Sequence, residues 1–168
     1  MRVRRRWPVT GGFQVAVCGP ARCTAAQAKQ ARRVGELLAA RGVTVLCGGG
    51  PGVMAAVAAG ARAAGGVVVG VLPGADRDDA SPDLAVAVVT NQGQARNAIL
   101  VQSADAVIAV GGSWGTLSEV ALAMRRGGVP VVSLDGWRVL DQAGDPVPGL
   151  QLATSPEQAV ALACSRSG

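Results

Sequence analysis

The sequence has no histidine, no tyrosine and a single lysine, Lys29. Without histidine, the chain cannot use a histidine general base, a histidine metal ligand or a serine–histidine catalytic pair. We therefore predict no metal site. Lys29 falls in the middle of the first predicted helix, which is a poor position for a Schiff base with pyridoxal phosphate. The sequence thus argues against a pyridoxal-phosphate-dependent decarboxylase.

Aromatic residues are also scarce, at 2% of the chain, although hydrophobic residues reach 49%. The core must therefore consist mainly of Val, Ala, Leu and Ile. Such a composition suits buried parallel strands that are covered by Ala-rich helices. A chain of 168 residues is long enough to bury a core of its own, so we expect one folded domain.

The net charge of +5 comes almost entirely from the N-terminus. Arg2, Arg4, Arg5 and Arg6 carry four of these charges, so residues 7–168 have a net charge of only +1. A nearly neutral body with few aromatic side chains to stack bases does not favour nucleic-acid binding. We expect residues 1–12 to form a basic, flexible leader and residues 13–168 to form the folded domain.

The leader is followed by an ordinary strand and not by the apolar segment of a signal peptide. No apolar stretch reaches membrane length, so we expect a cytoplasmic protein without a membrane partner. The cysteines are then expected to be reduced thiols. Cys18 and Cys47 end neighbouring predicted strands, where a cysteine is usually just a small apolar residue.

Short apolar runs alternate with helical patterns along the whole chain. Strands are predicted at residues 13–18, 43–47, 67–72, 84–89, 105–110 and 129–134. Helices are predicted at residues 25–40, 53–64, around 96–100, up to 126 after the fifth strand, and 157–164. Residues 135–154 are predicted to be a loop, and Pro130 places the last strand at or near a sheet edge. This alternation predicts an α/β fold: a doubly wound, Rossmann-like parallel sheet with helices on both faces.

The segment from Val110 to Glu119 combines a strand end, a Gly-rich turn and the start of a helix. The free N–H groups and the dipole of a helix N-terminus favour an anion. Gly111, Gly112 and Gly115 would let a phosphate approach the backbone closely. Glu119 lies about one turn into the helix, where a carboxylate is poorly placed as a phosphate ligand. The same features also fit a turn that only closes a βα unit, with a glutamate that the dipole alone favours.

Three Gly-bearing turns follow predicted strands: Gly19, Gly48–Gly52 and Gly111–Gly115. In a doubly wound sheet, ligands bind at the carboxyl ends of the strands, where the strand order reverses. We therefore predict that residues 13–168 form a nucleotide- or phosphate-binding domain for a small phosphorylated ligand. The chain lacks the GxGxxG fingerprint of dinucleotide-binding folds and the Gly-Lys-Ser/Thr ending of a Walker loop.

Three motifs occur together in the chain: Gly48-Gly49-Gly50-x-Gly52-Val53-Met54, Ala95-Arg96-Asn97 and Gly111-Gly112-x-x-Gly115-Thr116-x-x-Glu119. At this spacing they resemble the LONELY GUY (LOG) family and its wider nucleotide-binding superfamily, many of whose members were once described as lysine decarboxylases. The resemblance covers roughly residues 13–165. The run 69–74 and the pair Gly136-Trp137 make the chain most similar to a branch of short bacterial proteins, the molybdenum cofactor carrier-like proteins.

LOG enzymes hydrolyse the N-glycosidic bond of nucleoside 5′-monophosphates, giving free base and ribose 5-phosphate. The resemblance implies that the phosphate lies on Gly111, Gly112, Gly115 and Thr116. It also places the family's catalytic carboxylate on Glu119 and its catalytic arginine on Arg96. The cleavage passes through an oxocarbenium-like sugar, which an ionised carboxylate stabilises while it orients water. A nearby guanidinium can bind phosphate or ribose oxygens.

Two positions depart from the LOG pattern: Val110 stands where LOG enzymes have proline, and Asn97 stands where they have lysine. The carrier-like branch binds a pterin-phosphate cofactor without obvious catalysis. We therefore predict a carrier or sensor with a bound nucleotide or molybdenum cofactor, and no cofactor required for chemistry. The alternative is a hydrolase, a nucleoside 5′-monophosphate phosphoribohydrolase in which Glu119 and Arg96 act in the chemistry.

The predicted ligand-binding residues come from the three Gly-bearing turns. They are Gly19, Gly48, Gly49, Gly50, Gly52, Met54, Gly111, Gly112, Ser113, Trp114, Gly115 and Thr116. Trp114 could cover a bound base or pack on a partner subunit, and Met54 could line the pocket or belong to the core. Loop acids that could approach a leaving base are Asp76, Asp78 and Asp79, although most such acids are solvated.

The segment Ala55–Ala64 is apolar almost all round. A helix of this kind in a small domain must be covered by other parts of the protein. Together with the family resemblance, this predicts a homo-oligomer, either a dimer or a tetramer built from dimers.

Overall fold

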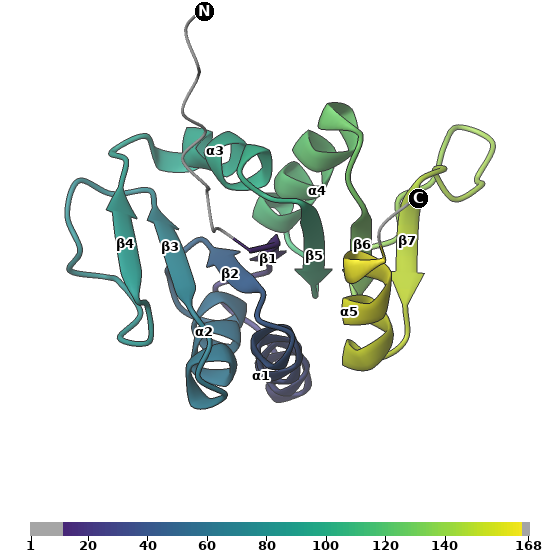
Figure 1. Ribbon diagram of the computed structural model, residues 1–168. Coiled ribbons are helices and arrows are strands. Elements are labelled where there is room, and N and C mark those ends of the chain that lie inside the picture. Colours follow the sequence, from purple (N-terminus) through teal and green to yellow (C-terminus); the bar gives the residue numbers. More distant parts are fainter. Residues whose placement is uncertain (1–11, 166–168) are drawn as a thin grey trace, which may run out of the picture.

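The computed structural model describes residues 12–165, which form one seven-stranded sheet with helices on both faces (Figure 1). The predicted leader at residues 1–12 therefore lies almost wholly outside the described residues. The strands are β1 (Gln14–Cys18), β2 (Thr44–Cys47), β3 (Val68–Leu72), β4 (Val86–Val89), β5 (Ala106–Val110), β6 (Val131–Leu134) and β7 (Leu150–Ala153). Their order is β4-β3-β2-β1-β5-β6-β7, and every neighbouring pair is parallel. The predicted doubly wound α/β fold is confirmed.

Five α-helices cover the sheet. They are α1 (Ala25–Ala40), α2 (Val53–Ala63), α3 (Arg96–Gln102), α4 (Trp114–Arg126) and α5 (Pro156–Cys164), and a short 3₁₀ turn, η1 (Gly93–Ala95), leads into α3. Helices α1, α2 and α5 lie on one face of the sheet, and α3 and α4 lie on the other (Figure 1). The side chains between helices and sheet form one hydrophobic core on each face. In this arrangement the helices cover the faces of the sheet, and only turns lie at the carboxyl ends of its central strands.

The prediction of a loop across residues 135–154 is wrong for its last part. Leu150–Ala153 is an edge strand that pairs in parallel with β6. Only Ala153 of these four residues is buried, so the segment lacks the long apolar run that marks the central strands. β6 itself lies next to the edge, as predicted from Pro130. The missing N–H of Pro130 costs the sheet little because its carbonyl still accepts a hydrogen bond from Val107 N at 2.9 Å.

The apolar helix α2 is covered within the same chain by α1. The two helices touch through Gly35 and Gly60, where a Cβ atom on either glycine would collide with the backbone of the other helix. Val57, Ala58 and Ala61 are fully buried as a result. The apolar character of α2 is therefore explained without a second subunit.

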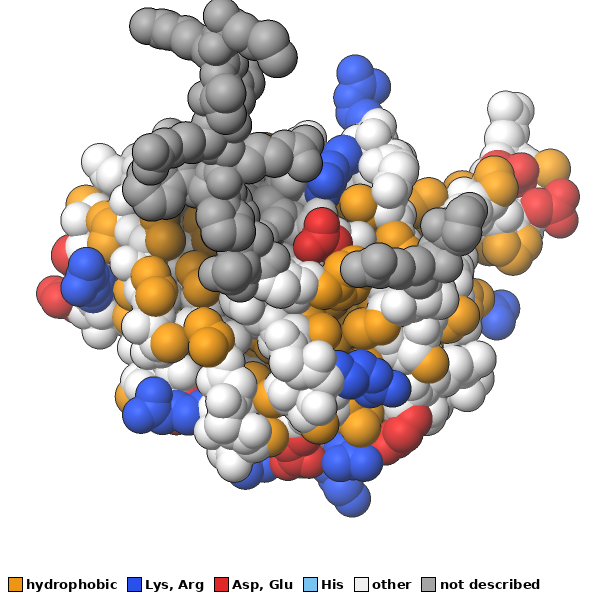
Figure 2. All heavy atoms as spheres, in the orientation of Figure 1, with side chains coloured by type: hydrophobic (Ala, Val, Ile, Leu, Met, Phe, Trp, Pro, Cys, Tyr) orange, Lys and Arg blue, Asp and Glu red, His pale blue; other side chains and the backbone are white. Residues whose placement is uncertain are grey.

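The edge strand β4 offers a different hydrophobic surface. Val86, Val88 and Val89 expose 50%, 41% and 38% of their area. Figure 2 shows hydrophobic side chains gathered over β3 and β4, at the left of the view. An exposed edge strand with apolar side chains is a ready surface for pairing with another chain. Among residues 12–165, none of the helices is both long and apolar enough to cross a membrane.

The homo-oligomer remains a prediction, and β4 is the surface on which we now expect it to form. Light scattering at micromolar concentration should give two or four times the 16.7 kDa of one chain. Because a lysine on an edge strand opposes pairing, Val86→Lys combined with Val88→Lys should shift the mass toward the monomer. Leu152→Lys, at a side chain that is 48% exposed on the opposite edge, is the matched control. A monomeric wild-type protein would refute the prediction, and dissociation by Leu152→Lys alone would place the contact on β7.

Candidate functional site

The three predicted Gly-bearing turns meet at one place in the structure. Gly19 follows β1, Gly48–Gly52 follows β2 and Gly111–Gly115 follows β5, and these three strands are neighbours in the order β2-β1-β5. The strand order reverses between β1 and β5, where the chain leaves to one side and later returns on the other. This is the position at which open α/β sheets bind ligands.

The turn after β5, residues 111–116, opens directly into α4. Ser113 caps the helix, because its Oγ accepts a hydrogen bond from Thr116 N at 3.1 Å. The first i→i−4 bond of the helix runs from Leu117 N to Ser113 O, so the N–H groups of Trp114 and Gly115 precede the helical ladder. A Cβ on Gly115 would meet only Ser113 Oγ, at 3.8 Å. Packing does not require a glycine there, and the close approach of a ligand to Gly115 stays a prediction.

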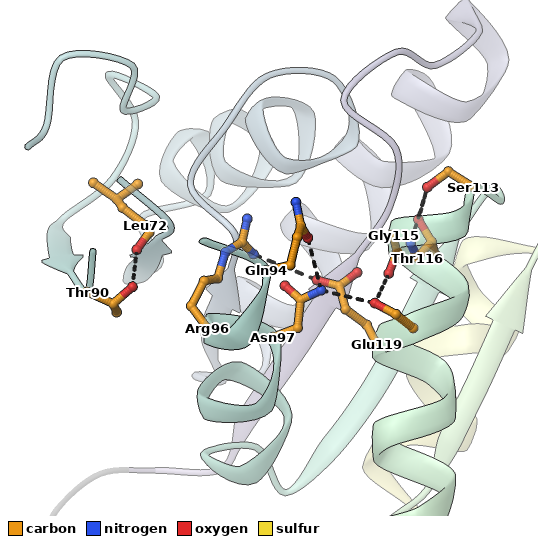
Figure 3. A network of polar contacts seen from close by, with 10 residues as sticks. Leu72, Thr90, Gln94, Arg96, Asn97, Ser113, Gly115, Thr116 and Glu119 are labelled. Atoms are coloured by element: carbon orange, nitrogen blue, oxygen red, sulfur yellow. Dashed lines mark hydrogen bonds and ion pairs between the residues drawn. The ribbon is translucent and has the colours of Figure 1, made fainter. Parts of the chain in front are cut away.

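Arg96 and Glu119 form a buried ion pair between α3 and α4 (Figure 3). Each residue is only 7% exposed, and Arg96 Nη1 lies 3.8 Å from Glu119 Oε1. The guanidinium lies against Gly48, where any Cβ atom would contact it. Within the described part of the chain, the buried Nε of Arg96 has no hydrogen-bond partner. A buried N–H donor normally has a hydrogen-bond acceptor, and none of the described residues supplies one to Arg96 Nε.

The protonation of Glu119 is governed by its burial. Burial raises the pKa of this carboxyl from 4.5 to about 7, although the charge of Arg96 and the thiol of Cys18 both lower it. Burial likewise holds the pKa of the Cys18 thiol well above its usual value, and Glu119 adds to this shift. Glu119 therefore exchanges a proton near neutral pH, as a general acid or base must.

A cavity of about 230 Å³ lies beside this pair, over the ends of β2 and β3. Its walls come from the turn after β2, from the start of α2, from the loop after β3 and from α3, and include Gly48, Gly49, Met54, Leu72, Asp76, Asp79 and Arg96. The volume is below the roughly 300–1,000 Å³ of sites that enclose a drug-sized ligand. The cavity can therefore hold one ring system, but not a whole nucleotide.

The cavity, the ion pair and the turn at residues 111–116 follow one another along the edge of the sheet. The cavity lies over β2 and β3, Arg96 lies against the end of β2, and Glu119 lies beside Cys18 at the end of β1. The turn follows β5. Two inter-strand steps of about 4.8 Å separate β2 from β5 and three separate β3 from β5, so the site is roughly 10–14 Å across. An elongated ligand with a ring at one end and a phosphate further along matches this layout.

The structure brings together most of the predicted ligand-binding residues but gives two glycines a packing role. A Cβ on Gly19 would collide with Val53, and one on Gly52 would collide with the carbonyl oxygen of Pro20. These contacts explain both glycines by packing alone, so their ligand-binding role stays a prediction. Met54 is half-buried: it lines the cavity and also packs against the hydrophobic core, so it fits both of the predicted alternatives.

Three contributors to the site were quoted in the sequence analysis only as motif residues and were not predicted to line the site. Leu72 lines the cavity, and the side-chain amide of Asn97 donates to Ser118 Oγ at 3.1 Å, which ties α3 to α4 (Figure 3). Trp137 packs on Gly112 in the turn after β5, although it lies in a different loop. Each contact joins residues from different strands or helices, so no local sequence signal marks it.

Comparisons with known proteins give consistent matches. The model of the SLOG cluster4 family matches residues 12–160. The molybdenum cofactor binding protein from the phototrophic bacterium Rippkaea orientalis superposes with a TM-score of 0.80 at 35% identity, and the match covers 89% of this chain and 94% of that chain. The molybdenum cofactor carrier protein MCP from Chlamydomonas reinhardtii gives a TM-score of 0.75 at 31% identity, with 89% and 94% covered. A cytokinin riboside 5′-monophosphate phosphoribohydrolase from Mycobacterium tuberculosis is 37% identical over 142 residues, which cover 79% of this chain and 76% of that protein.

The raised pKa of Glu119 predicts how the stability of the fold depends on pH. The neutral carboxyl favours the folded state, so its contribution is complete below about pH 4.5 and is lost as the pH rises through about 7. Glu119→Gln keeps a neutral group of similar shape at every pH. Between pH 4.5 and pH 8, the wild-type protein should therefore lose about 3 kcal/mol of unfolding free energy relative to the variant, measured by urea denaturation.

The matched control for this measurement is Glu157→Gln on α5. The exposed carboxylate of Glu157 accepts a hydrogen bond from Arg33, which lowers its pKa, so any effect should be small and of opposite sign. A difference between wild type and Glu119→Gln that stays constant with pH would show that Glu119 is not buried as described.

Proposed function

The chain belongs to the SLOG cluster4 family, and we propose that it binds a phosphorylated small molecule, a nucleotide or a molybdopterin-type cofactor, across the carboxyl ends of β2, β1 and β5. The resemblance to the LOG-like superfamily and to its molybdenum cofactor carrier-like branch is confirmed by the matches above. A carrier or sensor is the function that these relatives and the site support best.

The observation that carries this proposal is the incompletely satisfied guanidinium of Arg96. It lies nine-tenths buried, with an unpartnered Nε, and it lines a cavity of about 230 Å³. Its contact with Glu119 is long, at 3.8 Å, so the pair leaves donor capacity for a ligand oxygen. Keeping such a group buried costs stability, and a ligand that satisfies it would recover that cost.

The proposed orientation follows from the layout of the site. A ring system enters the cavity between Met54 and Leu72, and the phosphate lies on the N–H groups at the start of α4. Arg96 and Glu119 then face the part of the ligand between ring and phosphate. A molybdopterin-type cofactor, when bound, would supply a pterin ring and a phosphate to the same two places. The chain's own residues orient it and shield it, because the walls of the cavity are largely apolar.

A LOG-type hydrolase is the second candidate, favoured by the position of Glu119 and by the phosphoribohydrolase relative. In the proposed orientation, Glu119 faces the N-glycosidic bond of a nucleoside 5′-monophosphate. Above pH 7 its carboxylate is ionised and would stabilise positive charge on the sugar while taking a proton from the attacking water. Water would give its oxygen to the sugar carbon, and the released base would leave with the bonding electrons and take up a proton. Asp76 and Asp79 are the acids at the rim of the cavity.

Ligand binding is tested by removing the charge of Arg96 while keeping its bulk. Arg96→Met should weaken binding of the preferred nucleoside 5′-monophosphate by about 10- to 100-fold in calorimetry, because a buried charge-assisted hydrogen bond is lost. It should also lower the molybdenum content of protein purified from cells supplied with molybdate, measured by elemental mass spectrometry. Arg125→Met on the exposed side of α4 is the matched control and should behave as wild type. Equal behaviour of the two variants, or no nucleotide and no molybdenum bound, would refute the proposal.

Catalysis is tested separately by incubating the protein with a panel of nucleoside 5′-monophosphates and separating the products by chromatography. A hydrolase should release free base, and Glu119→Gln should lower the rate at least 100-fold while leaving binding within a few-fold. A carrier should release no base at any enzyme concentration and should bind its ligand with or without the substitution. Release that Glu119→Gln does not slow would exclude Glu119 from the chemistry.

A further inference from the structure

Two of the four Phe and Trp residues of the chain lie together beside the turn at residues 111–116. The ring centroids of Trp114 and Trp137 are 5.0 Å apart, and the rings are nearly perpendicular, at 88°. Trp114 is 78% exposed and Trp137 is 44% exposed, so the pair lies on the surface and not in the core. Apolar rings of this size normally contribute to cores or binding surfaces, because exposing them forgoes a large hydrophobic gain.

The pair is held in place by the turn itself. Trp137 packs directly on Gly112, and any Cβ atom at residue 112 would overlap its indole ring. The edge-to-face contact with Trp137 then orients Trp114, the first residue of α4. An aromatic surface that is positioned before a ligand arrives loses little conformational freedom on binding.

The pair lies on the opposite side of the turn from the cavity. The cavity lies over the ends of β2 and β3, whereas Trp137 follows β6, and β1 and β5 lie between them in the sheet. The order along the sheet edge is therefore cavity, ion pair, turn, tryptophan pair. A ligand with one ring in the cavity and its phosphate on the turn would not reach the tryptophan pair with that ring.

We propose that Trp114 and Trp137 form a second ring-binding subsite, and that the ligand carries two planar heterocycles joined through a diphosphate on the turn. This inference rests on the proposed function, because it requires the phosphate to lie at the start of α4. Such a ligand spans the reversal of strand order, with one half on the β1–β3 side and the other on the β5–β6 side. The GxGxxG fingerprint marks the first βα turn of a dinucleotide-binding sheet, whereas the phosphate here is placed on the turn after β5, so the absence of the fingerprint does not oppose a two-ring ligand.

The test compares nucleoside diphosphates with dinucleoside diphosphates that carry the same base, for all four common bases, in calorimetry. The two probes of each pair differ by one nucleoside and by the charge of the phosphate to which it is joined, so the part of the ratio that is lost in Trp114→Ala reports the second ring. For the best-bound base, wild type should bind the dinucleoside about 5- to 150-fold more tightly, the range expected for one ring stacked on an aromatic side chain. Trp114→Ala should bring this ratio close to one, because it should weaken binding of the dinucleoside more than binding of the nucleoside diphosphate.

Leu140→Ala is the matched control, because it removes an apolar side chain that is 50% exposed from the loop after Trp137 and should keep the ratio. Fluorescence gives a second readout. In a Trp7→Phe background, the remaining tryptophans should be quenched by the dinucleoside and not by the nucleoside diphosphate.

Each contrary result has a distinct meaning. If nucleoside diphosphates bind and dinucleosides bind no more tightly, the second subsite is refuted while the proposed function stands. If Trp114→Ala weakens both probes equally, the first ring stacks on the tryptophans, and the two-ring ligand is refuted. If Trp114→Ala changes the mass in light scattering without changing the ratio, the pair is a subunit contact. If no probe binds, the inference fails together with the proposal of a nucleotide ligand.

Discussion

The reversal of strand order between β1 and β5 is the constraint on which the rest of this structure depends. From β1 the chain builds β2, β3 and β4 outward on one side, and then returns to lay β5 against the other side of β1. Helices α1 and α2 cover one face of the sheet, whereas α3 and α4 cover the other, so the carboxyl ends of β2, β1 and β5 lie uncovered between them. The turns, the ion pair and the cavity all lie at this opening.

The Arg96–Glu119 pair is better explained by ligand binding than by stability. Two charged groups lose their hydration when they are buried, and a contact of 3.8 Å recovers only part of that loss. The raised pKa of Glu119 reflects the same imbalance, because burial outweighs the attraction of the neighbouring guanidinium. Apolar side chains of similar volume would pack at this position without such a cost. A chain that retains the pair therefore retains unsatisfied polar groups where a ligand could meet them.

Much of the fold and part of the site could be predicted from local sequence patterns. The buried strands β1, β2 and β5 are continuous apolar runs that end in glycines, and this pattern alone placed their turns at one edge of a parallel sheet. β7 was not predicted because Leu150–Ala153 is short and half-exposed and so has no clear strand pattern. The segment is a strand because it pairs with β6. The contact of Trp137 with Gly112 and that of Cys18 with Glu119 were also beyond reach. Both contacts depend on the strand order, which brings distant segments together. The residues next to each contact in the sequence carry no pattern that predicts it.

The cysteines beneath the site have a chemical consequence. Cys18 and Cys47 end adjacent strands, and burial holds the pKa of the first well above its usual value and raises that of the second to about 11. Because the thiolate and not the thiol is the reactive species, almost none of either sulfur is nucleophilic at neutral pH. Peroxides, disulfides and electrophilic ligands at the strand ends thus meet no thiolate at Cys18 or Cys47, and both side chains are buried. A reactive or oxidation-sensitive ligand bound at these strand ends would therefore not be attacked by either of the two buried cysteines.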